Sequence, residues 1–178
     1  MRLPAAGAEQ SNNRTIVKSF PLAPMSPLIR WLTVLLLVIP LFFVVMSATG
    51  AYFLSLPAVL LILIYAWVWL RFRPTTFMVY SNSLEVIWPL KRRRIPREEI
   101  TAVRQVDGEE LTREIGWGTR VGAGGLWGGF GLLWTRRRGM VQMYISRTDG
   151  YVWIERGDKR PWLLTPMQPE EFIRALKE

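Results

Sequence analysis

The sequence predicts a membrane-anchored α+β protein: two transmembrane helices, then a small antiparallel β-barrel or sandwich with a C-terminal capping helix. Three observations predict this class. Two long apolar runs stand close together near the N-terminus, period-two alternation follows them, and the last residues form an amphipathic helical pattern. The expected divisions are a cytoplasmic N-terminal tail over residues 1–28, a transmembrane helical hairpin over 29–72 and a cytoplasmic β-domain over 73–178.

The two apolar runs predict an antiparallel helical hairpin in the membrane. Trp31–Met46 is apolar except for Thr33, and Ala51–Leu70 is apolar except for Ser55. Each run extends to roughly 18–20 residues without a charge, enough to cross about 30 Å of hydrocarbon. A cleaved signal peptide is disfavoured because a second, equally long run follows the first. A buried soluble hairpin is disfavoured because the runs are apolar on every helix face.

The charges at the ends of the hairpin predict its orientation. Arg30 precedes the first run, and Arg71 and Arg73 follow the second, whereas the link Ser47–Gly50 carries no charge. Positive residues remain on the cytoplasmic side. We therefore expect an integral, multi-pass protein of the bacterial inner membrane with both termini in the cytoplasm.

The β-domain is expected from alternating segments rich in β-branched and aromatic residues. Strands are predicted over Thr76–Ser81 and Ser83–Trp88, near Ile100, and three more within Met140–Thr165. Asp149-Gly150 and Gly157-Asp158 predict tight hairpin turns because Asp and Gly accept a positive φ. In the N-terminal tail, Arg14–Phe20 alternates enough to be a short strand that could join the same sheet.

A C-terminal helix is expected to cap this sheet. Pro169 stands at a suitable first helical position, where its missing N–H is not needed, and Glu170 and Glu171 suit the positive end of the helix dipole. One apolar stripe is formed by Phe172, Ile173 and Leu176, and we expect it to pack on the sheet or close a barrel end.

The inventory of reactive side chains argues against an enzyme. The 178 residues contain no cysteine and no histidine, and carry a formal net charge of +9. Thiolate nucleophiles, cysteine zinc sites and histidine bases are therefore excluded. We expect no catalytic residue, no cofactor and no metal. The acidic cluster of Asp107, Glu109, Glu110 and Glu114 lies in or beside a short helical turn and is expected on the solvated surface, because a metal needs converging ligands.

In its order of motifs the chain resembles the bacterial pleckstrin-homology-like (PH-like) domains that many small bacterial membrane proteins carry beside two transmembrane helices. The resemblance rests on Ile95-Pro96 with Glu99-Ile100, the glycines of Gly118–Gly131, and the Thr165–Phe172 motif. It implies a seven-stranded bent sheet capped by a C-terminal helix. The family has no single established ligand, so the resemblance implies little about chemistry.

The segment Gly116–Gly131 holds eight of the fourteen glycines. Neither the dinucleotide spacing nor the P-loop spacing fits, because Val121 and Trp127 stand where a third glycine is needed and no lysine is present. Two interpretations remain. Either the glycines mark bends while Trp127 and Phe130 pack inward, or Trp117, Trp127 and Phe130 belong to an exposed loop that contacts lipid or a partner.

Two basic runs are candidate contacts for anionic phospholipid headgroups, at about 1 kcal/mol per basic residue. The first comprises Lys91, Arg92, Arg93 and Arg94, and the second Arg136, Arg137 and Arg138. Alternatively, both runs are solvated surface. Nucleic acid is not expected as a partner because no reading module accompanies the charge.

These observations together predict a non-enzymatic adaptor or assembly protein of the inner membrane. Its cytoplasmic domain would bind a protein partner or a second copy of the chain and contact anionic lipid. The alternative is a sensor of a lipid or cell-envelope component that uses the two arginine runs as headgroup contacts.

Overall fold

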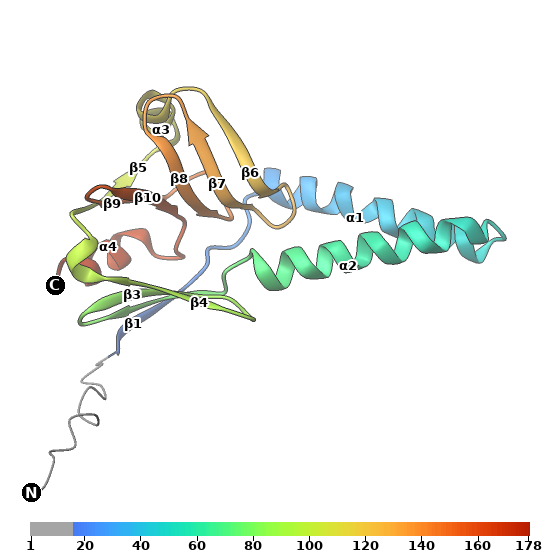
Figure 1. The fold of residues 1–178 in the computed structure, drawn as a ribbon, viewed down its shortest axis with the longest axis horizontal. Helices are drawn as coiled ribbons and strands as arrows, with labels where there is room; N and C mark the ends of the chain where they lie inside the picture. The colour runs from blue at the N-terminus through green and yellow to red at the C-terminus, as the bar shows by residue number, and fades with distance from the viewer. Residues whose placement is uncertain (1–15) are drawn as a thin grey trace, which may run out of the picture.

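The computed structural model describes residues 16–178, and this range forms two long apolar helices followed by two β-sheets and a C-terminal helix (Figure 1). The elements are, in chain order, β1 (Ile16–Pro21), α1 (Pro27–Ala48), η1 (Tyr52–Leu54), α2 (Ser55–Arg71), β2 (Thr76–Tyr80), β3 (Ser83–Ile87), β4 (Arg92–Pro96), η2 (Arg97–Glu99), β5 (Ala102–Val106), α3 (Gly108–Ile115), β6 (Gly118–Gly124), β7 (Gly129–Thr135), β8 (Gly139–Ile145), β9 (Tyr151–Arg156), β10 (Lys159–Leu164) and α4 (Pro169–Lys177).

The apolar hairpin consists of α1 and the continuous helical segment η1–α2. The spans Pro27–Ala48 and Tyr52–Arg71 have mean hydropathies of 2.6 and 2.3 and are long enough to cross a membrane. At 1.5 Å per residue, the 22 residues of α1 extend over about 33 Å. Most of their large apolar side chains are exposed, as expected of helices that face lipid. Between the helices, the hydroxyl of Tyr65 donates to the carbonyl of Leu36 at 3.0 Å.

Strand β1 precedes the hairpin in the chain but belongs to the domain that follows the hairpin. It pairs antiparallel with β2 from Ile16↔Tyr80 to Pro21↔Thr76. The predicted strand over Arg14–Phe20 is confirmed over Ile16–Phe20, and Arg14 and Thr15 lie outside the described residues. The amide of Leu22 donates to the carbonyl of Thr75 at 3.1 Å, so the two ends of the hairpin enter and leave the domain side by side. The hairpin is therefore an insertion between the first two strands of one sheet.

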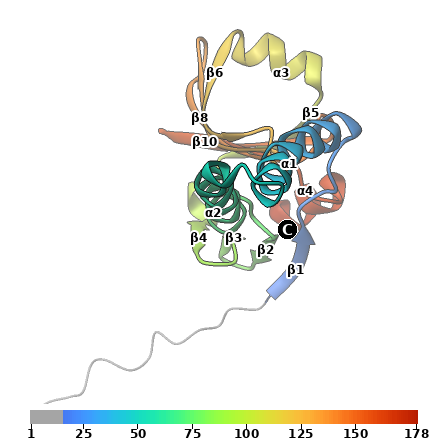
Figure 2. The ribbon, with the colours of Figure 1, turned by 90° about the vertical axis from the view of Figure 1, so that its right-hand side faces the viewer.

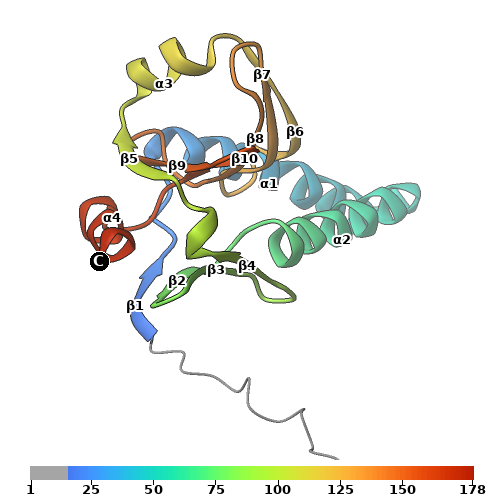
Figure 3. The same cartoon turned by 60° about the vertical axis from the view of Figure 1, so that its left-hand side comes forward.

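The two sheets pack face to face around the main core. The first has the order β1-β2-β3-β4 and the second the order β5-β9-β10-β8-β7-β6. Figure 3 shows them as separate layers, with α3 on the far side of the second sheet. Large side chains such as Phe77, Trp162 and Ile154 fill the space between the layers. Helix α4 supplies Phe172, whose ring meets that of Phe20 edge-on at 5.2 Å.

The connections differ from the sequence prediction at one of the two expected hairpins. Gly157-Asp158 does join the antiparallel pair β9 and β10. The prediction at Asp149-Gly150 is wrong: β8 and β9 are not neighbours, because β10 lies between them and runs parallel to β8. The connection instead starts at the buried Ser146, whose hydroxyl donates to the carbonyl of Ala23 at 2.6 Å. With ten strands in the described range, the sheets also exceed the seven strands that the resemblance implies.

A second, smaller core lies on the outer face of the six-stranded sheet. It contains Trp153, Met143, Leu163 and other apolar residues of the sheet, and Leu111 of α3 packs against them. Figure 2 shows α3 crossing above this sheet, on the side away from the four-stranded sheet. The six-stranded sheet therefore has apolar residues on both faces, and α3 covers only part of the outer one.

Candidate functional site

The candidate site is the junction between the apolar hairpin and the β-domain, where the glycine-rich segment contacts α1. The oxygen Oγ1 of Thr33 accepts the amide of Trp127 at 2.9 Å and lies 3.0 Å from the carbonyl of Gly125, to which it can donate. Only 3% of Thr33 is exposed, and its hydroxyl also lies 2.8 Å from the carbonyl of Ile29 in α1. Its single proton can therefore go to the helix or to Gly125, while its oxygen accepts from the domain. The turn between β6 and β7 is thereby fixed to the base of the hairpin.

Aromatic packing reinforces this contact from α2. The ring of Trp69 meets that of Trp127 edge-on at 4.8 Å, and the guanidinium of Arg73 lies 4.2 Å from the centre of the Trp69 ring. Trp127 itself has a φ of +60°, which is uncommon for a bulky residue and costs about 1–2 kcal/mol. The surrounding contacts with both helices hold it in this conformation.

The glycines of the turn serve close backbone approaches. A Cβ on Gly128 would lie 2.2 Å from the carbonyl oxygen of Ile145, and the φ of this residue is +150°. A Cβ on Gly125 would lie 3.1 Å from the side chain of Leu32 in α1. These positions require glycine because β8 on one side and α1 on the other approach the turn. The segment forms the β6–β7 hairpin and is not a nucleotide-binding loop.

The three aromatic residues predicted as candidates have three different environments. Phe130 is 1% exposed and belongs to the main core. Trp127 is partly buried between the domain and α2. Trp117 is 70% exposed and meets Trp134 edge-on at 6.4 Å. Each of the two interpretations of this segment therefore describes some of its residues: Phe130 in β7 points into the main core, whereas Trp127 lies in the β6–β7 turn and Trp117 precedes β6.

The basic run Lys91–Arg94 begins beside the end of α2. The indole of Trp88 donates to the carbonyl of Phe72 at 2.9 Å, and the ammonium of Lys91 lies 4.5 Å from the centre of the Trp88 ring. Burial, followed by the charges of Arg71 and Arg93, lowers the pKa of Lys91 from its ordinary value. Burial likewise lowers the pKa of Arg73, whose Nε has no hydrogen-bond partner in the described range.

We call Arg71, Arg73, Lys91 and Arg92 the basic collar. None of the four takes part in the nine ion pairs found among residues 16–178. The other members of the first run contact protein groups: Arg93 donates to Gln142 at 3.0 Å, and Arg94 donates to Asn82 at 3.0 Å and lies 4.0 Å from Glu85. The collar therefore carries like charges that the described part of the chain leaves uncompensated.

The second basic run lies at the other end of the β6–β7 hairpin. Arg136–Arg138 follows β7, whose seven residues lead away from the turn at α1 over about 24 Å. Arg138 forms an ion pair with Glu114, and Arg137 donates to the carbonyl of Arg113. These contacts fix α3 to the sheet, so two of the three arginines already have partners within the protein.

The acidic cluster contributes to the same attachment of α3. Asp107 caps this helix, accepting the amide of Glu110 at 2.7 Å, while Glu110 and Glu114 both pair with Arg104. Burial alone would raise the pKa of Glu114, but hydrogen bonds and charge from Arg104 and Arg138 outweigh it and lower that pKa. Within residues 16–178 no group of three or more acidic side chains is arranged to hold a metal ion.

Sequence reasoning missed Thr33, the central residue of the junction. It also missed Arg120 and Tyr151, which line a cavity between α3 and the six-stranded sheet. Thr33 did carry a signal, as the one polar residue in the apolar run Trp31–Met46. That signal could not identify its partner, because Gly125 and Trp127 lie more than ninety residues further along the chain. The pairing depends on the tertiary fold alone.

Two packed sheets closed by a C-terminal helix define the class as a PH-like β-sandwich attached to an apolar helical hairpin. The bacterial PH domain family model matches residues 75–178, more than half of the chain, and the protein belongs to this family. The match begins with β2, so β1 and the hairpin precede it. Neither a curated protein nor a solved structure gave a significant match. Membership indicates a module that binds protein or lipid.

Proposed function

We propose that this protein is a non-enzymatic adaptor of the bacterial inner membrane that presents a PH domain to a protein partner on the cytoplasmic side. The basic collar rests on anionic phospholipid headgroups and orients the domain. The observation that carries the proposal is the position of the collar. Four cations without an acidic partner in the described range lie at or near the end of α2. Arg71 and Arg73 are at its C-terminal end, the ammonium of Lys91 lies 5.9 Å from the centre of the Phe72 ring, and Arg92 follows Lys91 in the chain. The headgroups of a spanned bilayer would lie at this level.

The fixed geometry of the junction supports the adaptor proposal. A domain on a free linker would sample many orientations, whereas Thr33, Trp69 and Trp127 join this domain to both helices. A partner would then find the same face of the domain at the same height above the bilayer. Such preorganisation lowers the loss of conformational entropy when a partner binds.

The sensor alternative, with Arg92–Arg94 and Arg136–Arg138 as specific headgroup ligands, is less well supported. Of these six residues, Arg93, Arg94, Arg137 and Arg138 already contact protein groups. General electrostatic contact through the collar requires none of them to leave these partners.

The collar is tested with a probe at the tip of the β3–β4 turn. The chain contains no cysteine, so Leu90→Cys, at a position 63% exposed beside Lys91, gives a single attachment point for an environment-sensitive fluorophore. The full-length protein is placed in nanodiscs of neutral lipid or of neutral lipid mixed with phosphatidylglycerol. We expect a blue shift that depends on phosphatidylglycerol and decreases at high salt.

Matched charge removals decide the outcome. K91Q/R92Q removes two of the four collar charges and should clearly reduce the lipid-dependent shift, whereas R136Q/R160Q, which removes the same charge from exposed positions elsewhere, should preserve it. A shift that K91Q/R92Q leaves unchanged would contradict the collar. For the adaptor, crosslinking in intact membranes should give one stoichiometric partner or a second copy of the chain. A protein found always alone would contradict that part of the proposal.

A further inference from the structure

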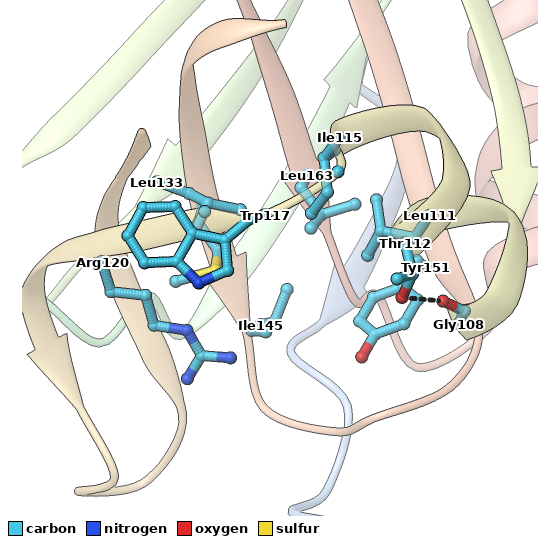
Figure 4. Close-up of a pocket in the computed structure, with 13 residues that line it drawn as sticks. Gly108, Leu111, Thr112, Ile115, Trp117, Arg120, Leu133, Ile145, Tyr151 and Leu163 are labelled. Atoms are coloured by element: carbon cyan, nitrogen blue, oxygen red, sulfur yellow. Dashed lines mark hydrogen bonds between the residues drawn. The ribbon is translucent and has the colours of Figure 1, made fainter. Parts of the chain in front are cut away.

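A cavity of about 650 Å³ lies between α3 and the outer face of the six-stranded sheet (Figure 4). Leu111 and Ile115 form its helical wall, and Leu133, Met143 and Leu163 form its floor on the sheet. This volume is within the range of pockets that bind small molecules, and the apolar walls are typical of them. None of these residues belongs to the basic collar.

The attachment of α3 explains why this space is open. Ion pairs fix one side of the helix to Arg104 and Arg138, and the Asp107 cap fixes its beginning. On the side toward the sheet, the large apolar side chains of the helix are those of Leu111 and Ile115. An eight-residue helix with two large apolar side chains on this face is too small to fill the sheet surface beneath it.

The burial of the lining indicates what can enter. The floor residues are at most 6% exposed, so the space is narrow. A protein partner needs about 800 Å² of accessible surface on each side of a stable interface, which nearly buried residues do not offer. A single hydrocarbon chain is slender enough to reach them. The cavity therefore fits an aliphatic chain better than a protein segment or a lipid with two chains.

One side of the cavity is polar and positive. Figure 4 shows the guanidinium of Arg120 and the hydroxyl of Tyr151 on the same side, with Ile145 between them. Arg120 is in none of the nine ion pairs of residues 16–178, whereas the nearby Asp149 already pairs with Arg147 at 3.3 Å. Burial raises the pKa of Tyr151 and Arg120 opposes this, which places the two groups within electrostatic reach.

We propose that this cavity binds a single-chain amphiphile with a carboxylate head, such as a free fatty acid. The chain lies between α3 and the sheet, and Arg120 and Tyr151 donate hydrogen bonds to the carboxylate. Charge-assisted bonds of this kind are the strong ones, and Arg matches carboxylate geometry. The inference is independent of the proposed adaptor function because the collar and the cavity share no residue.

The test uses the full-length protein in nanodiscs, since detergents are themselves amphiphiles and would compete. The probe is myristic acid with a photoreactive diazirine on its chain, and mass spectrometry locates the adducts. We expect adducts on the cavity residues. R120Q should lower their yield roughly tenfold, as loss of one charged hydrogen bond predicts, and R136Q should not change it. A tetradecanol probe with the same diazirine, lacking the carboxylate, should label the cavity as weakly as R120Q.

A second pair of variants tests occupancy of the volume. Thr112 of α3 is exposed and lines the cavity, so Thr112→Trp places a bulky ring in it, whereas Thr119→Trp places one at an exposed position on β6 outside it. Labelling should be lost in T112W and retained in T119W.

Three results would overturn the proposal. Two of them are equal labelling of R120Q and the unaltered protein, and adducts on α1 and α2 alone. The third is capture of a protein in cells by a photoreactive residue at position 112. K91Q/R92Q should leave labelling unchanged, which separates this result from that of the collar.

Discussion

Strand β1 should be indispensable to the domain although the apolar hairpin separates it from the other strands, and Phe20→Ala tests this. Phe20 is 0% exposed and meets Phe172 of α4 edge-on at 5.2 Å. Truncating a buried Phe to Ala costs about 3–5 kcal/mol, and the lost aromatic pair accounts for roughly 0.5–1.5 of that. Domains have only about 5–15 kcal/mol in total, so the variant should lose a large part of its stability.

The measurement is thermal unfolding of the full-length protein in nanodiscs, followed by near-UV circular dichroism. At a few degrees per kcal/mol, F20A should melt at least about 10 °C below the unaltered protein. Ser19→Ala is the matched control, because Ser19 is exposed on the same strand and should change stability by no more than about 0.5 kcal/mol. Equal melting temperatures for F20A and S19A would refute the role given to β1.

Excision of the hairpin extends the same reasoning. The amide of Leu22 lies 3.1 Å from the carbonyl of Thr75, so a short Gly-Ser turn can replace residues 24–74 without moving either strand. This chain should fold as a soluble domain with a cooperative transition. A chain that starts at residue 75 should not, because it exposes Phe77, Phe172 and the edge of β2. Equal stability of the two chains would contradict the prediction.

Three further predictions concern the junction and α3. Thr33→Val removes the acceptor of the Trp127 amide and should raise the hydrogen-exchange rate of that amide roughly tenfold. Thr49→Val, at the far end of α1, is the control and should leave this rate unchanged. An unchanged rate in T33V would mean that the hydrogen bond of 2.9 Å does not protect the amide. Gly128→Ala should prevent stable folding, because its Cβ would lie 2.2 Å from a carbonyl oxygen. Gly139 has a φ of +67° but open space around it, so Gly139→Ala should lower the free energy of unfolding, measured by denaturation, by only about 1–2 kcal/mol. Because the pKa of Glu114 is lowered in the folded state, its stabilisation is complete above the ordinary value of 4.5 and is lost as the pH falls through the lowered pKa. Thermal unfolding at pH 7 and pH 3 should therefore show a smaller loss for E114Q than for the unaltered protein or for E98Q at an exposed site, and parallel losses would contradict the assignment.

The sequence predicted the elements better than their partners. Continuous apolarity located the hairpin, and alternation located β2, β3 and the strands from β8 to β10, because burial on one or both faces leaves a local pattern. Strand β4 was not predicted, since Arg92–Arg94 resembles a solvated charge run and only Ile95 is buried. Strand order is a long-range property, so the Asp149-Gly150 turn appeared to join neighbours that β10 in fact separates.

The candidate site could be predicted only in part for the same reason. The sequence does not show that Trp117, Trp127 and Phe130 lie in three different environments. Glycines flank these residues, so no alternation of apolar and polar side chains indicates which face of a sheet each one is on. The two basic runs look alike in sequence, yet one begins beside the end of α2 and the other forms contacts that attach α3 to the sheet. Whether a given arginine has a protein partner depends on which groups the fold places beside it. The cavity depends on the length of α3 and on side chains from five strands and loops, and no local motif encodes it.

The insertion of the hairpin between β1 and β2 also has a consequence for biosynthesis. The ribosome delivers β1 first, and its pairing partner emerges only after both apolar helices have been made. For a hairpin that crosses the bilayer, Pro21 can meet Thr76 only if the chain has returned to its starting side. A molecule with one helix inserted would hold these residues on opposite sides of about 30 Å of hydrocarbon. The first sheet can therefore be completed only after both helices have been inserted, and a chain with one helix inserted keeps the edge of β2 unpaired.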